Sequence, residues 1–205
     1  MTDVSCLETA NLSLLRELFA SATHDASAAM CCWTNSLITL TLDEVCEIPL
    51  QNVCADLNLG DEPLTMVVFD LDGGTSGAMV LTFTEQSARR LAGSLLEAEV
   101  GQGPGWNELE RSALTETGNI LGCAYVNAIT RLIDHQVVPS VPHFVVDFAA
   151  SVLQQALLGQ VHSTDTVLIG RTRFQHKDAE LDWWLLFIPT SDLRTVMERG
   201  LPKAR

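Results

Sequence analysis

The chain has 205 residues, a formal net charge of −14 and a hydrophobic content of 47%. This length suits one large domain or two small fused halves, and the hydrophobic content favours a packed core over disorder. An acidic surface repels phosphate backbones and anionic lipid, so we predict neither nucleic acid nor a membrane as a partner.

No signal-peptide pattern opens the sequence, and its apolar runs are too short to span a bilayer. These features predict a cytoplasmic protein. The six cysteines contain no C-x-x-C pair, and the five histidines are scattered. We therefore expect free thiols, and no metal or other cofactor bound by this chain.

The first half of the chain predicts a helix, a strand, a hairpin and a second helix, at residues 12–33, 37–42, 64–83 and from Thr84 onward. The first helix is a long apolar stretch rich in small residues, and the strand alternates apolar residues with threonine. The hairpin joins two apolar runs through the glycine-rich turn 72–77. Thr84 is the expected N-cap of the helix that follows.

The second half predicts a long helix at residues 106–132, a helix at 145–158, a hairpin at 166–188 and a last helix capped near Thr190. Asp147 is expected at the start of the second of these helices, where a carboxylate favours the positive end of the helix dipole.

The two halves therefore follow a similar order, with hairpins about one hundred residues apart. We interpret the chain as one domain, 1–205, built from pseudo-repeats at about 9–100 and 106–200. The glycine-rich stretch 101–105 would link them. This interpretation predicts an α/β fold with pseudo-twofold symmetry, in which two helix–strand–hairpin–helix units share one mostly antiparallel sheet packed by helices.

The long helix carries a polar motif. Ser112, Glu116 and Asn119 are spaced i, i+4, i+7, so at 3.6 residues per turn they line one face. The opposite face is formed by Leu114, Gly118, Leu121, Tyr125 and Leu132. We expect the apolar face to dock on the sheet, so that the polar face points outward on a rigid element.

Pro142 follows Asn119 after 22 residues. The complete pattern resembles the signature of the CheC, CheX and FliY phosphatases: Asp or Ser, three residues, Glu, two residues, Asn, twenty-two residues, Pro. The chain length and the duplicated layout also resemble CheC. The resemblance covers essentially the whole chain. It implies a phosphatase that hydrolyses the aspartyl phosphate of a CheY-like receiver domain in chemotaxis signalling.

The resemblance also implies roles for the four residues. Asn119 would orient the attacking water, and Glu116 would pair with a lysine of the receiver, while Ser112 and Pro142 would support the site. The receiver would bring its own Mg²⁺, so none is expected on this chain. The phosphorylated receiver would be the main partner, and the deamidase CheD, which CheC proteins characteristically bind, is a further candidate.

The duplication predicts a second set of positions in the first half. An offset of 99 residues, which relates Glu116 to Glu17, maps the motif onto Ser13, Glu17, Ala20 and Asp43. The first set keeps the serine and the acid, but it lacks the amide and the proline. Typical CheC proteins resemble two-site enzymes. Because the first set lacks the amide and the proline, the sequence predicts that this chain departs from that pattern and has a single site.

A different function class is also compatible with the sequence. The chain could be a non-catalytic binding module for a phosphorylated receiver, for CheD or for a flagellar switch partner. The middle domain of the flagellar switch protein FliM looks like an example, in which the same fold is used for binding without turnover. A pure binder has no need of a water-positioning amide, so Asn119 favours the enzyme. Cys123 lies one turn after Asn119 on the same face, without a histidine near it in sequence to activate it as a nucleophile.

Overall fold

The structure is a computed structural model of the whole chain, and it describes residues 4–34, 38–56, 62–72, 77–97, 105–158, 166–176 and 179–200. Its described strands are β1 (Ile38–Pro49), β2 (Leu64–Asp72), β3 (Gly77–Phe83), β4 (Val138–Pro139), β5 (His143–Asp147), β6 (Thr166–His176) and β7 (Ala179–Pro189). The longer helices are α1 (Val4–Trp33), α3 (Glu85–Leu96), α4 (Glu108–Ile133), α5 (Ala149–Leu158) and α6 (Ser191–Gly200). The short segments η1 (Leu50–Asn52) and α2 (Val53–Asp56) follow β1.

The described strands form one sheet in the order β1-β6-β7-β3-β2-β4, and β5 also pairs with β2. Every pairing is antiparallel. The hairpin β2–β3 lies beside the hairpin β6–β7, and the outer strand of each hairpin pairs with strands from the other half of the chain. The expected α/β fold with a mostly antiparallel sheet packed by helices is therefore confirmed.

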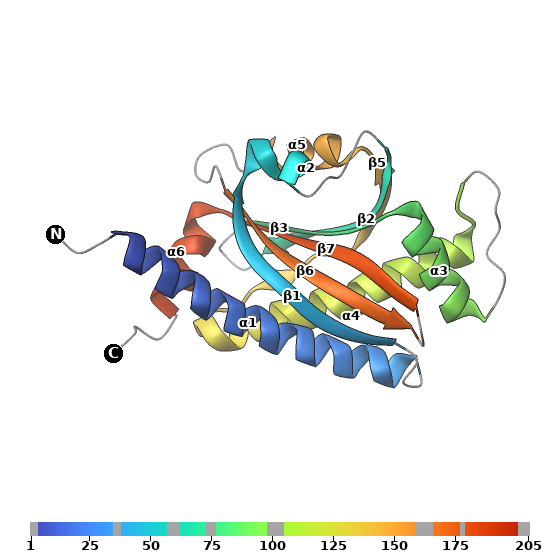
Figure 1. Cartoon of the computed structure of the whole chain (residues 1–205), viewed down its shortest axis with the longest axis horizontal. Helices are drawn as coiled ribbons and strands as arrows, with labels where there is room; N and C mark the ends of the chain where they lie inside the picture. The colour runs from blue at the N-terminus through green and yellow to red at the C-terminus, as the bar shows by residue number, and fades with distance from the viewer. Residues whose placement is uncertain are drawn as a thin grey trace.

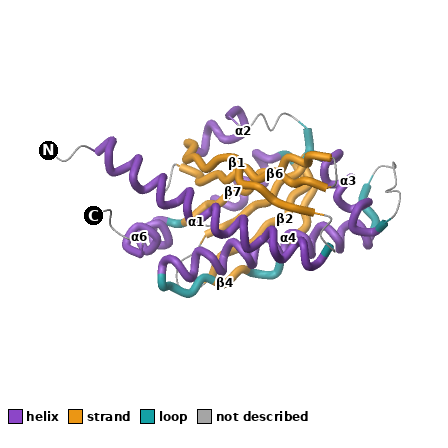
Figure 2. Tube along the Cα trace, turned by 60° about the horizontal axis from the view of Figure 1, so that its bottom comes forward, coloured by secondary structure: helices purple, strands orange, loops and turns teal. Residues whose placement is uncertain are grey.

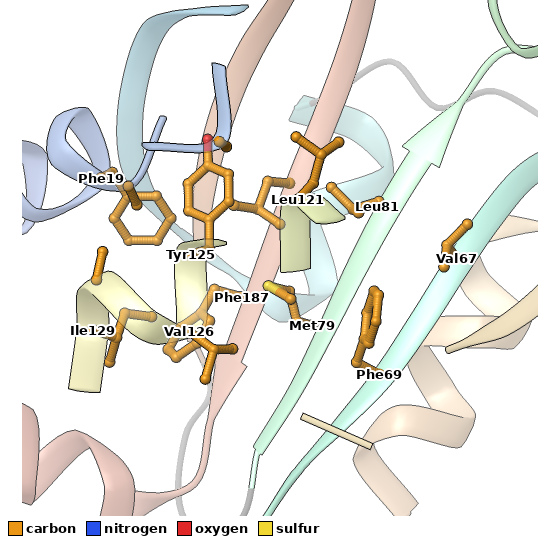
Figure 3. Packing of buried hydrophobic residues seen from close by; sticks show 14 of the residues in the cluster. Phe19, Val67, Phe69, Met79, Leu81, Leu121, Tyr125, Val126, Ile129 and Phe187 are labelled. Atoms are coloured by element: carbon orange, nitrogen blue, oxygen red, sulfur yellow. The ribbon is translucent and has the colours of Figure 1, made fainter. Parts of the chain in front are cut away.

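Helices α1 and α4 run side by side across one face of the sheet (Figures 1 and 2). They cover the larger core, in which Phe19 and Tyr125 from the helices meet Phe69, Met79 and Phe187 from the strands (Figure 3). A smaller core lies on the opposite face, beneath α2 and α5. Two helices therefore separate the larger core from solvent, and their outer faces are available for function. None of the helices that the structure describes is long and apolar enough to cross a membrane.

Both hairpins lead into a helix capped by threonine. The Oγ1 atom of Thr84 accepts a hydrogen bond from the backbone N–H of Ser87 at 3.2 Å, as the sequence predicted. At the equivalent point of the second half, Oγ1 of Thr190 accepts one from the backbone N–H of Leu193 at 3.4 Å. The same local chemistry therefore begins α3 and α6.

The predicted helix at 145–158 is wrong at its start. Residues 143–147 form β5 instead, because they pair with the edge of β2, from His143 opposite Val68 to Asp147 opposite Leu64. The helix begins only at Ala149. Asp147 is thus the last residue of a strand, and its Oδ1 accepts a hydrogen bond from the backbone N–H of Phe148 at 2.7 Å.

The division into two pseudo-repeats stays a prediction. Only Gly105 of the proposed linker 101–105 belongs to the described part of the chain. Residues 73–76 of the glycine-rich turn and residues 177–178 of the second hairpin turn also lie outside the described residues.

Candidate functional site

Helix α4 begins at a capping box that fixes its first turn. The side chain of Asn107 accepts a hydrogen bond from the backbone N–H of Glu110 at 2.9 Å, and Oε2 of Glu110 accepts one from the backbone N–H of Asn107 at 3.0 Å. Glu110 is only 3% exposed, so the reciprocal bonds are largely shielded from water. This pattern, Asn followed three residues later by Glu, was readable in the sequence but was missed.

The inner face of α4 lies directly on the sheet. Leu114, Leu121 and Tyr125 are buried as predicted, whereas the side chain of Leu132 is outside the described residues. Gly118 allows an unusually close approach, since a β-carbon there would lie 2.5 Å from Cγ1 of Val67 on β2. The packing of these residues fixes the height of the helix above the sheet, and with it the position of the outer face.

The outer face carries the motif. Ser112 and Glu116 are exposed, and Asn119 is half-buried. Glu116 makes no hydrogen bond or ion pair with any residue that the structure describes. An unpaired, exposed carboxylate on a rigid helix can form an ion pair with a cation of a docked partner at little desolvation cost.

The side chain of Asn119 accepts a hydrogen bond from the next turn of its own helix. The thiol of Cys123, one turn later, donates a hydrogen bond to its Oδ1 atom with a sulfur–oxygen distance of 3.6 Å. Burial, and secondarily the negative charge of Glu116, raises the pKa of the Cys123 thiol. A protonated thiol can donate but is a poor nucleophile, so Cys123 is unsuited to covalent chemistry.

Pro142 lies in the connection between β4 and β5, which is anchored beside α4 at several points. The Oγ1 atom of Thr130 donates to the carbonyl of Val137 at 3.4 Å near the C-terminal end of the helix. Ser140 is held to β2, where its N–H donates to the carbonyl of Asp70 at 2.8 Å. Near the N-terminal end, the guanidinium of Arg111 lies over the ring of Phe144, 5.2 Å from its centroid. The structure therefore brings the proline segment alongside the helix that carries Ser112, Glu116 and Asn119.

The equivalent positions of the first half are arranged differently. Ser13, Glu17 and Ala20 lie on an exposed face of α1. Asp43 lies instead at the register shift between Leu42 and Glu44 in the pairing of β1 with β6. Its carboxylate forms an ion pair with Arg173 on β6, at 3.1 Å.

The irregularities at positions 43 and 142 are related by the offset of 99 that also relates Glu17 to Glu116. At Asp43, β1 continues through its register shift, whereas the extended segment that contains Pro142 is divided into β4 and β5. The first set of positions thus keeps a carboxylate on its helix but has neither the amide nor the proline break.

A hollow of about 1020 Å³ opens next to the N-terminal end of α4, and its lining includes Trp106, Arg111 and Phe144. Neither Glu116 nor Asn119 is among the described residues that line it. The motif is therefore presented on an outer helix face, which suits contact with another macromolecule better than enclosure of a small molecule. Within the described ranges, no group of three or more His, Cys, Asp or Glu side chains is placed to hold a metal ion.

The sequence has curated relatives. It is 25% identical to the CheY-P phosphatase CheC of Bacillus subtilis over 187 residues, which cover 88% of each chain. It is 26% identical to the CheC1 protein of Halobacterium salinarum over 145 residues, which cover 71% of each chain. No family model matches the chain.

The fold has solved counterparts at lower sequence identity. The crystal structure of FliY from Thermotoga maritima superposes with a TM-score of 0.74 at 16% identity, covering 95% of this chain and 97% of the chain in that structure. The FliM middle domain from H. pylori gives 0.69 at 11%, covering 92% and 97%. CheX, from its complex with CheY, BeF₃ and Mg²⁺ in Borrelia burgdorferi, gives 0.57 at 15%, covering 85% and 97%. The chain is therefore similar in sequence to CheC proteins, and it shares its fold with FliY, FliM and CheX.

Proposed function

We propose that this chain is a phosphatase that hydrolyses the aspartyl phosphate of a CheY-like receiver domain in chemotaxis signalling. The observation that carries the proposal is the outer face of α4, where an exposed carboxylate and a half-buried amide stand one turn apart on a helix fixed at its start and along its buried face. The B. subtilis relative, named a CheY-P phosphatase, and the CheX–CheY complex support the choice of substrate.

The chemistry required of such a site is small. An aspartyl phosphate is an activated acyl phosphate, and a receiver supplies a metal ion and a lysine that neutralise the developing charge. Hydrolysis still needs a water molecule held in line with the bond that breaks. The water oxygen forms a bond to phosphorus as the bond from phosphorus to the aspartyl oxygen breaks, which leaves the receiver aspartate as a carboxylate. One proton of the water stays on the inorganic phosphate, and the other passes to solvent.

Asn119 and Glu116 fit two separate parts of that task. The carboxamide of Asn119 can donate to the water through its NH₂ group and accept from it through a lone pair of Oδ1. The unpaired carboxylate of Glu116 is free to bind the receiver lysine and so fix the docking register. Ser112 and Pro142 would support the site, Ser112 on the helix face and Pro142 in the anchored connection beside it.

This chain would bind no cofactor of its own, and Mg²⁺ would belong to the receiver. The donor set supports that expectation, since the motif offers one carboxylate and one amide where Mg²⁺ prefers several oxygen ligands. The function would place the protein in the cytoplasm, with the phosphorylated receiver as its partner.

A dephosphorylation assay tests the proposal. Receivers of the same organism are phosphorylated, and inorganic phosphate release is followed with and without the protein. We expect faster release for at least one receiver, and no turnover of free acetyl phosphate, because that small molecule lacks the receiver metal and lysine. If every phosphorylated receiver decays at its intrinsic rate, the proposal is wrong.

Binding without turnover is the second candidate. The superposition on FliM and the exposed face of α1, which presents Glu17 without a neighbouring amide, favour it. In that case the partner would be the phosphorylated receiver, CheD or a flagellar switch protein. The same assay separates the two functions if receiver binding is measured alongside phosphate release.

A further inference from the structure

We propose that Cys123 is a positioning residue of this site, whose thiol orients the carboxamide of Asn119 so that its NH₂ group faces the attacking water. The inference rests on the proposed function, because the water is the substrate of that reaction. It concerns a residue that neither the signature spacing nor the four-residue motif includes.

The geometry gives the hydrogen bond a direction. A thiol has one hydrogen to donate, and the sulfur lies 3.6 Å from Oδ1 of Asn119. A carboxamide presents an acceptor on one side and a double donor on the other. Holding Oδ1 toward Cys123 therefore turns Nδ2 away from it, and Nδ2 has no hydrogen-bond partner among the described residues.

The backbone beneath the thiol is fixed. Cys123 follows Gly122, where a β-carbon would lie 2.9 Å from both Cε of Met79 and Cζ of Phe69 on the sheet. Tyr125, two residues further on, is 2% exposed. The thiol thus projects from a stretch of α4 pressed against the core, and it holds Asn119 from a point that cannot move easily.

The protonation state of Cys123 supports this role. Burial raises its pKa, and the nearby charge of Glu116 acts in the same direction. The group stays a thiol at neutral pH and keeps its hydrogen for Oδ1. A thiolate would accept instead of donate, and it would favour the reversed carboxamide.

Loss of the thiol should affect turnover more than binding. In Cys123→Ala the carboxamide can rotate between two orientations, and only one presents its NH₂ group to the water. A neutral hydrogen bond of this kind corresponds to a decrease in kcat of about threefold to tenfold. KM for the phosphorylated receiver should change little, because Ser112 and Glu116 are untouched.

The experiment compares four proteins with the phosphorylated receiver: wild type, Cys123→Ala, Cys123→Ser and Cys54→Ala. Serine keeps a donor at the same position, so it should retain most of the wild-type kcat. Cys54→Ala removes another half-buried thiol, on α2 beyond the opposite face of the sheet, and should leave kcat unchanged. Cys123→Ala in an Asn119→Ala background should cause no further loss.

A second readout needs no receiver. The side-chain NH₂ resonances of Asn119, assigned by their disappearance in Asn119→Ala, should shift in Cys123→Ala and return toward wild type in Cys123→Ser. If these resonances do not move in Cys123→Ala, the positioning role is wrong. It is also wrong if the wild type is active and Cys123→Ala has the same kcat. If wild type accelerates no receiver, the proposed function fails, while the resonances still decide whether Cys123 orients Asn119.

Discussion

Gly118 on α4 lies directly against Val67 on β2, with no room between them for even a methyl group. A β-carbon at Gly118 would be 2.5 Å from Cγ1 and 2.9 Å from Cβ of Val67. The other half of the chain shows the opposite combination of sizes, since Phe19 on α1 lies over Gly170 on β6, where a β-carbon would be 3.1 Å from the ring. Each helix–sheet contact thus combines one glycine with one larger residue.

Gly118→Ala should destabilise the protein. Alanine in a helix interior is normally favoured over glycine by about 1 kcal/mol, but overpacking a close-packed contact costs about 1–3 kcal/mol. At 2.5 Å the clash should dominate, so we expect a net loss of about 1–2 kcal/mol in the free energy of unfolding, measured in urea. In the double variant Gly118→Ala/Val67→Ala, the total loss of stability should be smaller than the sum of the losses in the two single variants. Strict additivity would show that the contact is not tight.

The hairpins and the motif helix were predictable because their signals are local. Two apolar runs on either side of a glycine-rich turn predicted β2 and β3, and the spacing of Glu116 and Asn119 predicted the outer face of α4. Thr84 was recognised as a cap because capping depends on residues only three positions apart.

Apart from the capping box of Asn107 and Glu110, which is local and was nevertheless missed, the errors concern partners distant in sequence. Residues 143–147 form a strand because the edge of β2, more than seventy residues earlier, is available for pairing. Asp43 was recognised only as a lost proline, whereas its ion pair with Arg173 depends on a strand from the other half of the chain. The hydrogen bond from Cys123 to Asn119 is different, since its i, i+4 spacing was visible and only its meaning was missed.

Tyr125→Phe should lower stability and change its dependence on pH. The Tyr125 hydroxyl lies 2.6 Å from Oγ1 of Thr23 and 3.1 Å from Oγ1 of Thr172, so it joins α1, α4 and β6 in the core. Removing it takes a hydrogen-bond partner from two buried hydroxyls, at a cost of about 1–3 kcal/mol.

The pH effect has a definite sign. Burial raises the pKa of Tyr125, so above the ordinary tyrosine pKa of about 10 the unfolded chain loses a proton that the folded protein keeps. The contribution of Tyr125 to the free energy of unfolding should therefore be fully present below about pH 10 and decline as the pH rises above that value. Buried thiols add to the decline in both proteins, since burial also raises the pKa values of Cys46, Cys54 and Cys123. Urea unfolding from pH 8 to 11 should give a shallower decline for Tyr125→Phe, and equal slopes would contradict the assignment to this residue.

Asn119→Ala should abolish most of the proposed activity while leaving docking in place. Losing one preorganised transition-state contact costs about 3–4 kcal/mol, which is about two to three orders of magnitude in kcat. Single-turnover decay of the phosphorylated receiver measures the effect, and receiver affinity should stay near the wild-type value. A variant that turns over at the wild-type rate would exclude a water-positioning role for this amide.

Chelation should distinguish the metal of the receiver from any metal of this chain. If the protein is treated with EDTA and then freed of the chelator, we expect full activity toward a Mg²⁺-loaded phosphorylated receiver. Removing Mg²⁺ from the receiver should instead slow phosphate release strongly, because the charge on the transferring phosphoryl group is then poorly neutralised. Loss of activity after the first treatment, restored only by adding metal to this chain, would contradict a cofactor-free site.

Glu116→Ala and Glu17→Ala form a matched pair that tests whether only the second-half positions work. Both glutamates are exposed on neighbouring helices, α4 and α1, but only Glu116 has an amide one turn away, since position 20 is alanine. Glu116→Ala should raise KM for the phosphorylated receiver, because the carboxylate that would bind the receiver lysine is gone. The kcat should also fall, because the receiver is then docked less accurately and the attacking water is no longer held in line with the bond that breaks. Glu17→Ala should leave both constants near the wild-type values. Glu116→Gln keeps the size and removes the charge, so it should resemble Glu116→Ala in KM if charge pairing sets the docking. If Glu17→Ala is as impaired as Glu116→Ala, the first-half face contributes to docking or catalysis and the single-site assignment is wrong.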